Sequence, residues 1–144
     1  MISLHAWNLF LVALFFIYLL IKNLCPLYPF NDLQKKTSVH RKSELFYQYL
    51  PLLVIGCCLY INSPFTTKLA FIITIILFIS HIFTWWFPYI LGAHRVTKHE
   101  YEQLYSKTSK LLPPIRKNLV PDNQHLIVTL FLLLLLIHEF IIVF

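Results

Sequence analysis

Residues 126–144, LIVTLFLLLLLIHEFIIVF, form a run in which almost every side chain is apolar. A helix rises 1.5 Å per residue, so this run is long enough to cross the roughly 30 Å hydrocarbon core of a bilayer. Its only acid is Glu139, which lies roughly 7 Å along the helix axis from Phe144. The run therefore predicts a membrane-spanning helix that carries a carboxyl group near one end.

Three further runs pass the same length test, and they cover residues 4–21, 45–62 and 69–91. The whole chain is 58% hydrophobic and 12% charged, whereas a soluble domain has about 25% charged residues. Pro51 lies inside the second run and is expected to kink that helix or to mark a later start. These observations predict an all-α integral membrane protein, a bundle of four transmembrane helices that forms a single membrane domain over residues 1–144.

The basic residues predict the orientation of these spans. Eleven of the 12 Lys and Arg residues lie in the two long connections, 22–44 and 92–124, and only Lys68 lies in the short turn between spans two and three. By the positive-inside rule both long loops are cytoplasmic and both termini lie outside the cell membrane. The net charge of +6 is thereby explained without nucleic acid. The usage of Ile, Phe, Lys and Asn hints at an AT-rich bacterial source.

The loop 92–124 contains a pattern typical of a short amphipathic helix. Thr97 and Glu100 have the spacing of a capping box, apolar residues then recur at helical intervals, and Pro113 stops the helix. A cytoplasmic amphipathic helix is therefore predicted over about Lys98 to Leu112, lying on the inner leaflet or under the bundle. Contact with anionic lipid headgroups is expected for Lys35, Lys36, Arg41, Lys42, Arg116 and Lys117.

Five polar side chains are expected inside the membrane: Asn8, Gln48, His81, His138 and Glu139. The favoured hypothesis is that Glu139 accepts a structural hydrogen bond from Asn8, from His5 or from the free amino terminus. Two alternatives remain open, a protonatable site for ion or proton movement and no role at all. Gln48 and His81 lie at similar predicted depth, so they are expected to hydrogen-bond across helices.

No enzyme signature is recognisable in the chain. The three cysteines form no CxxC pair, and no GxSxG, HExxH or Walker motif occurs. His, Asp, Glu and Arg residues do gather around the predicted cytoplasmic interface, Asp122 and His125 among them. The candidates for catalysis, if the protein is an enzyme, are His94, His99, Glu100 and Arg116. No metal site and no cofactor are predicted.

Three functional hypotheses follow. The first is a small polytopic membrane protein that acts through protein–protein contacts, as an accessory subunit or an immunity-type protein, with a membrane-protein partner or as a homo-oligomer. The second is an inner-leaflet enzyme that acts on a lipid or lipid-linked substrate. The third is a small oligomeric transporter or channel. Substrate, partner and oligomeric state are not predicted from these residues.

Overall fold

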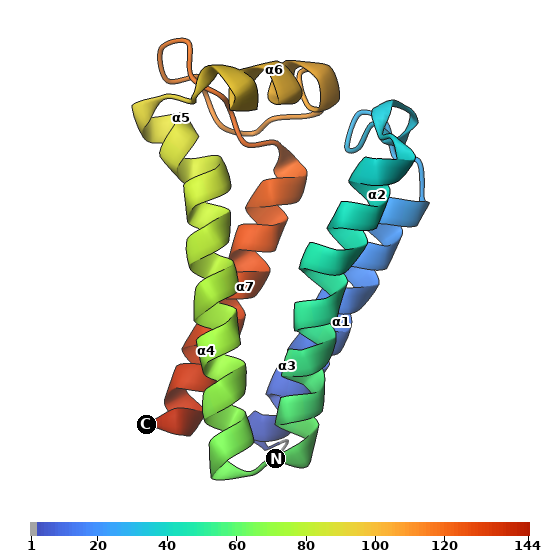
Figure 1. Cartoon of the computed structure of the whole chain (residues 1–144). Coiled ribbons are helices and arrows are strands. Elements are labelled where there is room, and N and C mark those ends of the chain that lie inside the picture. The colour runs from blue at the N-terminus through green and yellow to red at the C-terminus, as the bar shows by residue number, and fades with distance from the viewer. Residues whose placement is uncertain (1–2) are drawn as a thin grey trace.

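The computed structural model describes residues 3–144, apart from the side chains of His40, Arg41, Leu45 and Val96. This part of the chain is 75% helical and contains no strands. Four of its helices are long and apolar enough to span a membrane. They run side by side, with α1 beginning and α7 ending at one end of the bundle and α6 lying at the other (Figure 1).

Each of the four long helices begins before the predicted first residue of its span or continues past the predicted last residue. The first is α1 (Leu4–Leu24), and the fourth is α7 (Asn123–Val143). The second runs through α2 (Ser38–Glu44), η2 (Leu45–Tyr49) and α3 (Leu50–Ile61). The third runs through α4 (Pro64–His81), η3 (Ile82–Trp86) and α5 (Phe87–Leu91). Asp122 caps α7, and its side chain accepts a hydrogen bond from the His125 backbone N–H, as expected for an aspartate at this position.

Both composite helices contain a π-helical turn directly before a proline-containing turn. η2 precedes Pro51, and η3 precedes Pro88. A proline lacks a backbone N–H and its ring crowds the carbonyl four residues earlier. A wider turn accommodates that crowding without breaking the helix. Pro51 therefore neither ends nor restarts the second helix, which continues from Lys42 to Ile61.

The connection between spans two and three is much shorter than predicted. Asn62 adopts a left-handed conformation, with φ of 53°, and ends α3. The Ser63 side chain then accepts a hydrogen bond from the Thr66 backbone, and the Thr66 side chain accepts one from the Ser63 backbone. This reciprocal cap, followed by Pro64 at the first helical position, starts α4 at residue 64 instead of residue 69.

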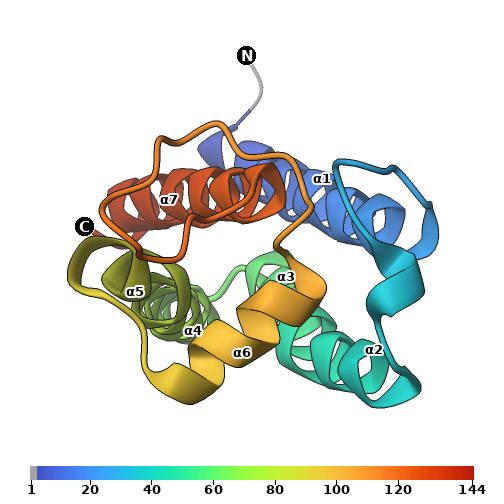
Figure 2. The same cartoon turned by 90° about the horizontal axis from the view of Figure 1, so that it is seen from above.

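The four long helices pack as a ring. α1 contacts α3 and α7, and α4 contacts the same two helices, an arrangement visible along the bundle axis (Figure 2). The buried core runs down the middle, with Phe15 and Leu19 from α1, Ile55 from α3, Ala70 from α4 and Leu135 from α7. The ring thus encloses an apolar core, and the polar groups on its inward faces are largely removed from solvent.

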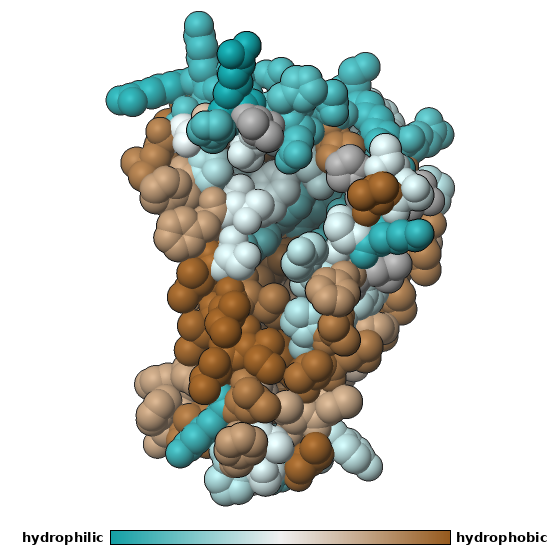
Figure 3. Space-filling model, in the orientation of Figure 1, coloured by the Kyte–Doolittle hydropathy of each residue, from teal (hydrophilic) through white to brown (hydrophobic). Residues whose placement is uncertain are grey.

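The outer surface of the bundle is hydrophobic along most of its length. Large apolar side chains are exposed on all four helices, for example Ile17, Ile72, Phe83 and Phe140. Hydrophilic residues gather over the α6 end, above a hydrophobic band (Figure 3). Such an exposed apolar surface is far larger than soluble monomers tolerate. A lipid environment would cover it.

The helix in the loop 92–124 differs from the prediction at both ends. α6 spans Arg95–Leu104, with His94 at its N-cap and no side-chain capping bond, so Thr97 is not the cap. The second half of the predicted helix forms turns instead. The Thr108 hydroxyl bonds to Asp122, and the Ser109 backbone bonds to Pro29 and to Asn123. These tertiary hydrogen bonds hold residues 105–112 in a non-helical path.

Candidate functional site

A cavity of about 510 Å³ lies in the half of the bundle nearer to α6. It is bounded by α1, by η2 and the start of α3, by the end of α4 with η3, and by the first three turns of α7. Its inner part is apolar, with Phe15, Leu52 and Leu132. Its outer part carries the polar side chains Lys22, Gln48, Ser80, His81, Thr84 and His125.

Lys22 is the cation of this cavity. Its side chain is almost fully buried, with 2% of the residue exposed, and Nζ lies 3.2 Å from Gln48 Oε1. Among the described residues none of the ion pairs includes Lys22, and Glu44 and Asp122 attract its charge only from a longer distance. A buried ammonium is ordinarily stabilised by a directly paired counter-charge. The positive group at the polar end of the cavity therefore lacks a direct ion-pair partner.

Asp122 and His125 form a buried pair at the start of α7. Their side chains are three residues apart, and Asp122 Oδ1 lies 2.5 Å from His125 Nδ1. Asp122 Oδ2 also accepts from Thr108 Oγ1 at 3.0 Å and from Gln124 Nε2 at 3.2 Å. Burial acts to raise the pKa of Asp122, but the hydrogen bonds from His125 and Thr108 outweigh it, so the pKa is lowered. Asp122 thus remains ionised and orients the imidazole.

The His125 ring is held between aromatic side chains. It stacks on Trp85 with 3.3 Å between ring centroids, and Tyr105 meets it edge-on at 5.2 Å. His125 Nδ1 bonds to Asp122. The other ring nitrogen, Nε2, has no hydrogen-bond partner among residues 3–144, and it is not completely buried. Since His125 lines the cavity, this nitrogen is the one available to a bound molecule. An imidazole held in this way can accept or donate a proton.

His81 closes the same wall through a separate set of hydrogen bonds. Its Nε2 lies 3.1 Å from the His125 carbonyl oxygen and 2.9 Å from Thr129 Oγ1. The indole N–H of Trp86 donates to the same hydroxyl at 3.0 Å. α4, η3 and α7 are therefore tied together directly beside the cavity, which makes this wall rigid.

A smaller cavity of about 250 Å³ adjoins the first one and shares Thr84 and Trp85 with it. It is lined by the Lys36–Glu44 ion pair, whose N–O distance is 2.6 Å, and by residues of α6. Tyr105 lies at this boundary, and burial raises its pKa. α6 and η3 thus connect the buried polar cluster to the surface at the loop-bearing end.

The polar residues expected at this depth have partners other than the predicted ones. Gln48 and His81 both line the cavity, but no hydrogen bond joins them: Gln48 bonds to Lys22, and His81 bonds to α7. The Tyr18 hydroxyl donates to the Gln124 carbonyl oxygen at 3.1 Å. The proposed Gln48–His81 pairing is therefore replaced by links to α1 and α7.

The Glu139 end of the bundle is a second polar cluster. Glu139 is fully buried, and its Oε1 accepts from Thr74 Oγ1 at 3.2 Å instead of from Asn8 or His5. Asn8 is also fully buried, and neither of its side-chain polar atoms has a partner among the described residues. His138 is partly buried and its Nδ1 is unpartnered there too. Met1, whose amino group was a predicted partner, lies outside the described residues.

The residues predicted for catalysis are spread over the surface of the loop-bearing end. His94, His99, Glu100 and Arg116 are all exposed, and Glu100 alone lines a cavity, the smaller one. The structure does not bring these four into one site, and their role stays a prediction.

The basic residues predicted to contact lipid headgroups differ in their exposure and in their ion pairing. Lys42, Arg116 and Lys117 are exposed, Lys35 pairs with Asp32 at 2.9 Å, and Lys36 is buried against Glu44. The Arg41 side chain lies outside the described part. Headgroup contact therefore stays a prediction for the exposed members, while Lys36 is turned inward.

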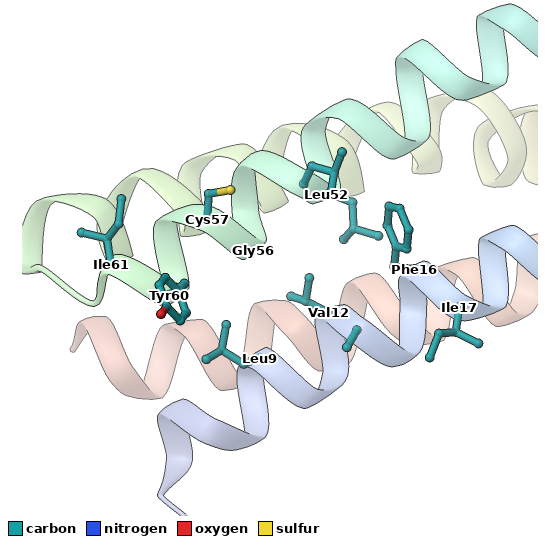
Figure 4. A pocket seen from close by; sticks show the side chains of 11 residues that line it. Leu9, Val12, Phe16, Ile17, Leu52, Gly56, Cys57, Tyr60 and Ile61 are labelled. Atoms are coloured by element: carbon teal, nitrogen blue, oxygen red, sulfur yellow. The ribbon is translucent and has the colours of Figure 1, made fainter.

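A further groove of about 600 Å³ lies between α1 and α3 and is almost wholly apolar. Val12 and Phe16 face Leu52 and Gly56 across it (Figure 4). It presents no ionisable group apart from the Cys57 thiol and the Tyr60 hydroxyl. Such a groove suits lipid chains or another helix, and it carries no chemistry of its own.

The sequence reasoning missed the inward role of Lys22, although the spacing of the buried residues gives a detectable signal for it. Residues Asn8, Val12, Phe15, Leu19 and Lys22 are all buried and follow one stripe of α1 at alternating spacings of four and three. Residues His125, Leu132, Leu135 and Glu139 follow the corresponding stripe of α7. Polar residues in register with apolar ones at that spacing face the same partner.

Comparisons with known proteins add no assignment. No known protein family, no curated protein and no solved structure matches this chain.

Proposed function

We propose that the protein spans a membrane four times, with the α6 end in the cytoplasm, and that its 510 Å³ cavity binds an amphipathic lipid by an anionic headgroup. The orientation rests on the concentration of Lys and Arg in the two long loops. The observation that carries the ligand assignment is the burial of Lys22 without a direct ion-pair partner among the described residues. An anionic headgroup would supply that charge.

The shape of the cavity supports an amphipathic ligand over a free anion. Along α1 its lining runs from Lys22 to Phe15, which is roughly 10 Å at 1.5 Å per residue. Polar groups occupy the loop-bearing end and apolar ones the deeper end. A phosphate near Lys22 would therefore continue into a chain that lies against Leu52 and Leu132.

The cavity also opens toward the surface on which lipid would lie. Tyr47 lines it on one side and Ile76 on the other, and their exposed fractions are 70% and 61%. They mark a lateral opening between the second and third long helices, and the surface is hollowed on this side (Figure 3). A lipid could enter from the membrane plane without passing through the loops.

The test is binding of a defined lipid to the purified protein. Delipidated protein in mild detergent is titrated with dioleoyl phosphatidic acid and with dioleoyl phosphatidylcholine, and complexes are counted by native mass spectrometry. The proposal expects the phosphomonoester lipid to bind more tightly, and Lys22→Met to remove this preference. Lys42→Met is the matched control, because Lys42 is an exposed lysine at the same end. The proposal is refuted if the wild type binds both lipids equally, or if Lys42→Met loses the preference for phosphatidic acid while Lys22→Met keeps it.

The Asp122–His125 pair favours a second candidate, an enzyme that acts on an ester bond of the same class of lipid. His125 Nε2 would accept a proton from a water molecule that attacks the acyl carbonyl carbon, while Asp122 stabilises the imidazolium. The imidazolium would then return the proton to the leaving alcohol as the ester C–O bond breaks, which releases a fatty acid and a lysolipid. The test is incubation of the protein with phosphatidic acid vesicles and analysis of the lipids by mass spectrometry. Conversion that is lost in His125→Gln, with binding retained, supports this candidate. Unchanged lipid after demonstrated binding refutes it for this substrate.

Two other hypotheses remain predictions. Contact with a protein partner would use an outer face such as the groove between α1 and α3, which suits lipid chains equally well. A transporter or channel would require an oligomer, since an apolar core fills the interior of the ring between the two polar ends. Mild-detergent purification with identification of bound proteins, and ion flux in liposomes, test these two respectively.

A further inference from the structure

We infer that Glu139, Asn8 and Thr74 form a second site, a buried binding site for a small monovalent metal cation at the end of the bundle opposite α6. The inference is independent of the lipid site, since it concerns different residues at the other end of α1 and α7. It rests on three observations: a carboxyl group without a counter-charge, a hydroxyl shared between two acceptors, and an amide without partners.

The carboxyl group of Glu139 is isolated in the interior. The residue has no exposed surface, and Oε2 has no hydrogen-bond partner within residues 3–144. None of the ion pairs found in that part of the chain includes Glu139. A buried carboxylate is strongly disfavoured unless a cation or several donors compensate its charge. A bound cation would provide that compensation.

Within the described residues, the hydrogen bond to the Glu139 carboxyl group comes from a hydroxyl that is already engaged. Thr74 Oγ1 lies 3.1 Å from the Ala70 carbonyl oxygen and 3.2 Å from Glu139 Oε1. A hydroxyl has one proton, so it can satisfy one of these acceptors fully or both weakly. When the proton points to Ala70, the lone pairs of Thr74 Oγ1 face the carboxylate. Two oxygens in that arrangement are stabilised by a cation that both can coordinate.

Asn8 completes the cluster from the neighbouring helix. α1 and α7 run antiparallel, and Phe15 stacks on Phe131 with 4.8 Å between ring centroids. Two helical turns from that contact, toward the end where α1 begins, lie Asn8 on α1 and Glu139 on α7. Asn8 is fully buried on the inward stripe, and both its amide oxygen and its amide nitrogen lack partners in the described chain. Asn8 and Glu139 therefore lie at one level of the bundle on two helices in contact, and we assign the unpartnered amide oxygen as a ligand for a cation held beside Glu139.

The donor set indicates the class of cation. Carboxylate, amide and hydroxyl oxygens are hard ligands, which suit alkali and alkaline-earth ions better than transition metals. One carboxylate balances a single positive charge, so the buried site is neutral with a monovalent ion and carries net charge with a divalent one. Sodium and lithium are the probes of choice, with potassium as a larger ion of equal charge.

The experiment measures the thermal unfolding midpoint of the purified protein in mild detergent. Sodium chloride replaces choline chloride at constant ionic strength and neutral pH, and lithium and potassium chloride are tested in parallel. The inference expects a saturable rise of the midpoint with sodium or lithium. Retention of radioactive sodium by the wild type at equilibrium dialysis provides the direct measure of binding.

Variants assign the response to the site. Glu139→Gln keeps a hydrogen-bonding side chain without the charge, and Asn8→Leu removes the amide, so both should lose the cation response. Glu102→Gln removes an exposed acid on α6 and should keep it, as should Lys22→Met at the lipid site. If Glu139→Gln fails to fold, the cation responses of Asn8→Leu and Thr74→Val decide whether the site binds the ion. No cation-specific rise in the wild type, or an equal rise in these variants, overturns the inference. Either outcome would mean that a proton or another group neutralises Glu139.

Discussion

Replacing Lys22 by methionine should separate ligand binding from folding. The side chain is buried, and Nζ has the neutral Gln48 amide as its one hydrogen-bond partner in the described chain. Methionine has similar length and no charge, so the variant fills the same space without a buried ammonium. We expect the protein to fold as well as the wild type and to bind anionic lipid much more weakly.

The magnitude follows from two opposing contributions to stability and one to binding. Gln48 loses its partner, which costs about 1–3 kcal/mol when a buried acceptor is left unpaired. Removing a buried charge that has no direct ion-pair partner regains energy of about similar size. Binding, by contrast, loses a charge-assisted hydrogen bond worth about 1.5–3 kcal/mol. At about 1.4 kcal/mol per factor of ten, the Kd for phosphatidic acid should rise roughly 10- to 150-fold.

The assay is a titration of delipidated protein with phosphatidic acid, read by native mass spectrometry, beside a thermal unfolding curve of the same samples. Lys42→Met, in which an exposed lysine is removed, controls for general attraction of anionic lipid to the basic loops. Its Kd should stay within about threefold of the wild type, because exposed charges are screened by solvent and salt.

Two results would refute the reasoning. If Lys22→Met binds phosphatidic acid as tightly as the wild type, Lys22 does not contact the headgroup. If instead the variant unfolds at a much lower temperature, Lys22 stabilises the fold and its charge is compensated within the protein.

Three further predictions concern the fold and its orientation. The pKa of Asp122 is lowered in the folded protein, so its ionised form stabilises the fold above the unfolded-state pKa of about 3.9, and this contribution is lost as the pH falls through the folded-state pKa. Asp122→Asn should therefore be less stable than the wild type at pH 7, by about 1 kcal/mol. The difference in unfolding midpoint between the two proteins should disappear in acid. Leu135→Ala should cost about 2–5 kcal/mol of unfolding free energy, because Leu135 is fully buried, while Leu133→Ala, at a position 43% exposed, should cost far less in the same denaturation assay. A cysteine placed at Glu102, in a variant without the three natural cysteines, should react with an impermeant maleimide only after cells are permeabilised; labelling of intact cells would reverse the proposed orientation.

The sequence alone determined the number and approximate position of the long helices. Runs of about 20 residues that are almost wholly apolar can satisfy their backbone hydrogen bonds in lipid only as helices. Asp122, which caps α7, is likewise a local signal, because aspartate is favoured at a helix N-cap. Both features depend on residues that are close together in the sequence, so they can be identified without knowing the tertiary structure.

Tertiary structure decided which polar groups meet. Lys22 was counted with a cytoplasmic loop, yet it completes the buried stripe of α1, and Glu139 bonds to Thr74 instead of to Asn8. α6 ends at Leu104 because residues 105–112 bond to Pro29, Asp122 and Asn123. The physical reason is that these helices are apolar on nearly every side, so hydrophobicity does not reveal how each one is rotated about its axis. Only packing in the ring determines which side chains point inward, and with them the 510 Å³ cavity and the cluster around Glu139.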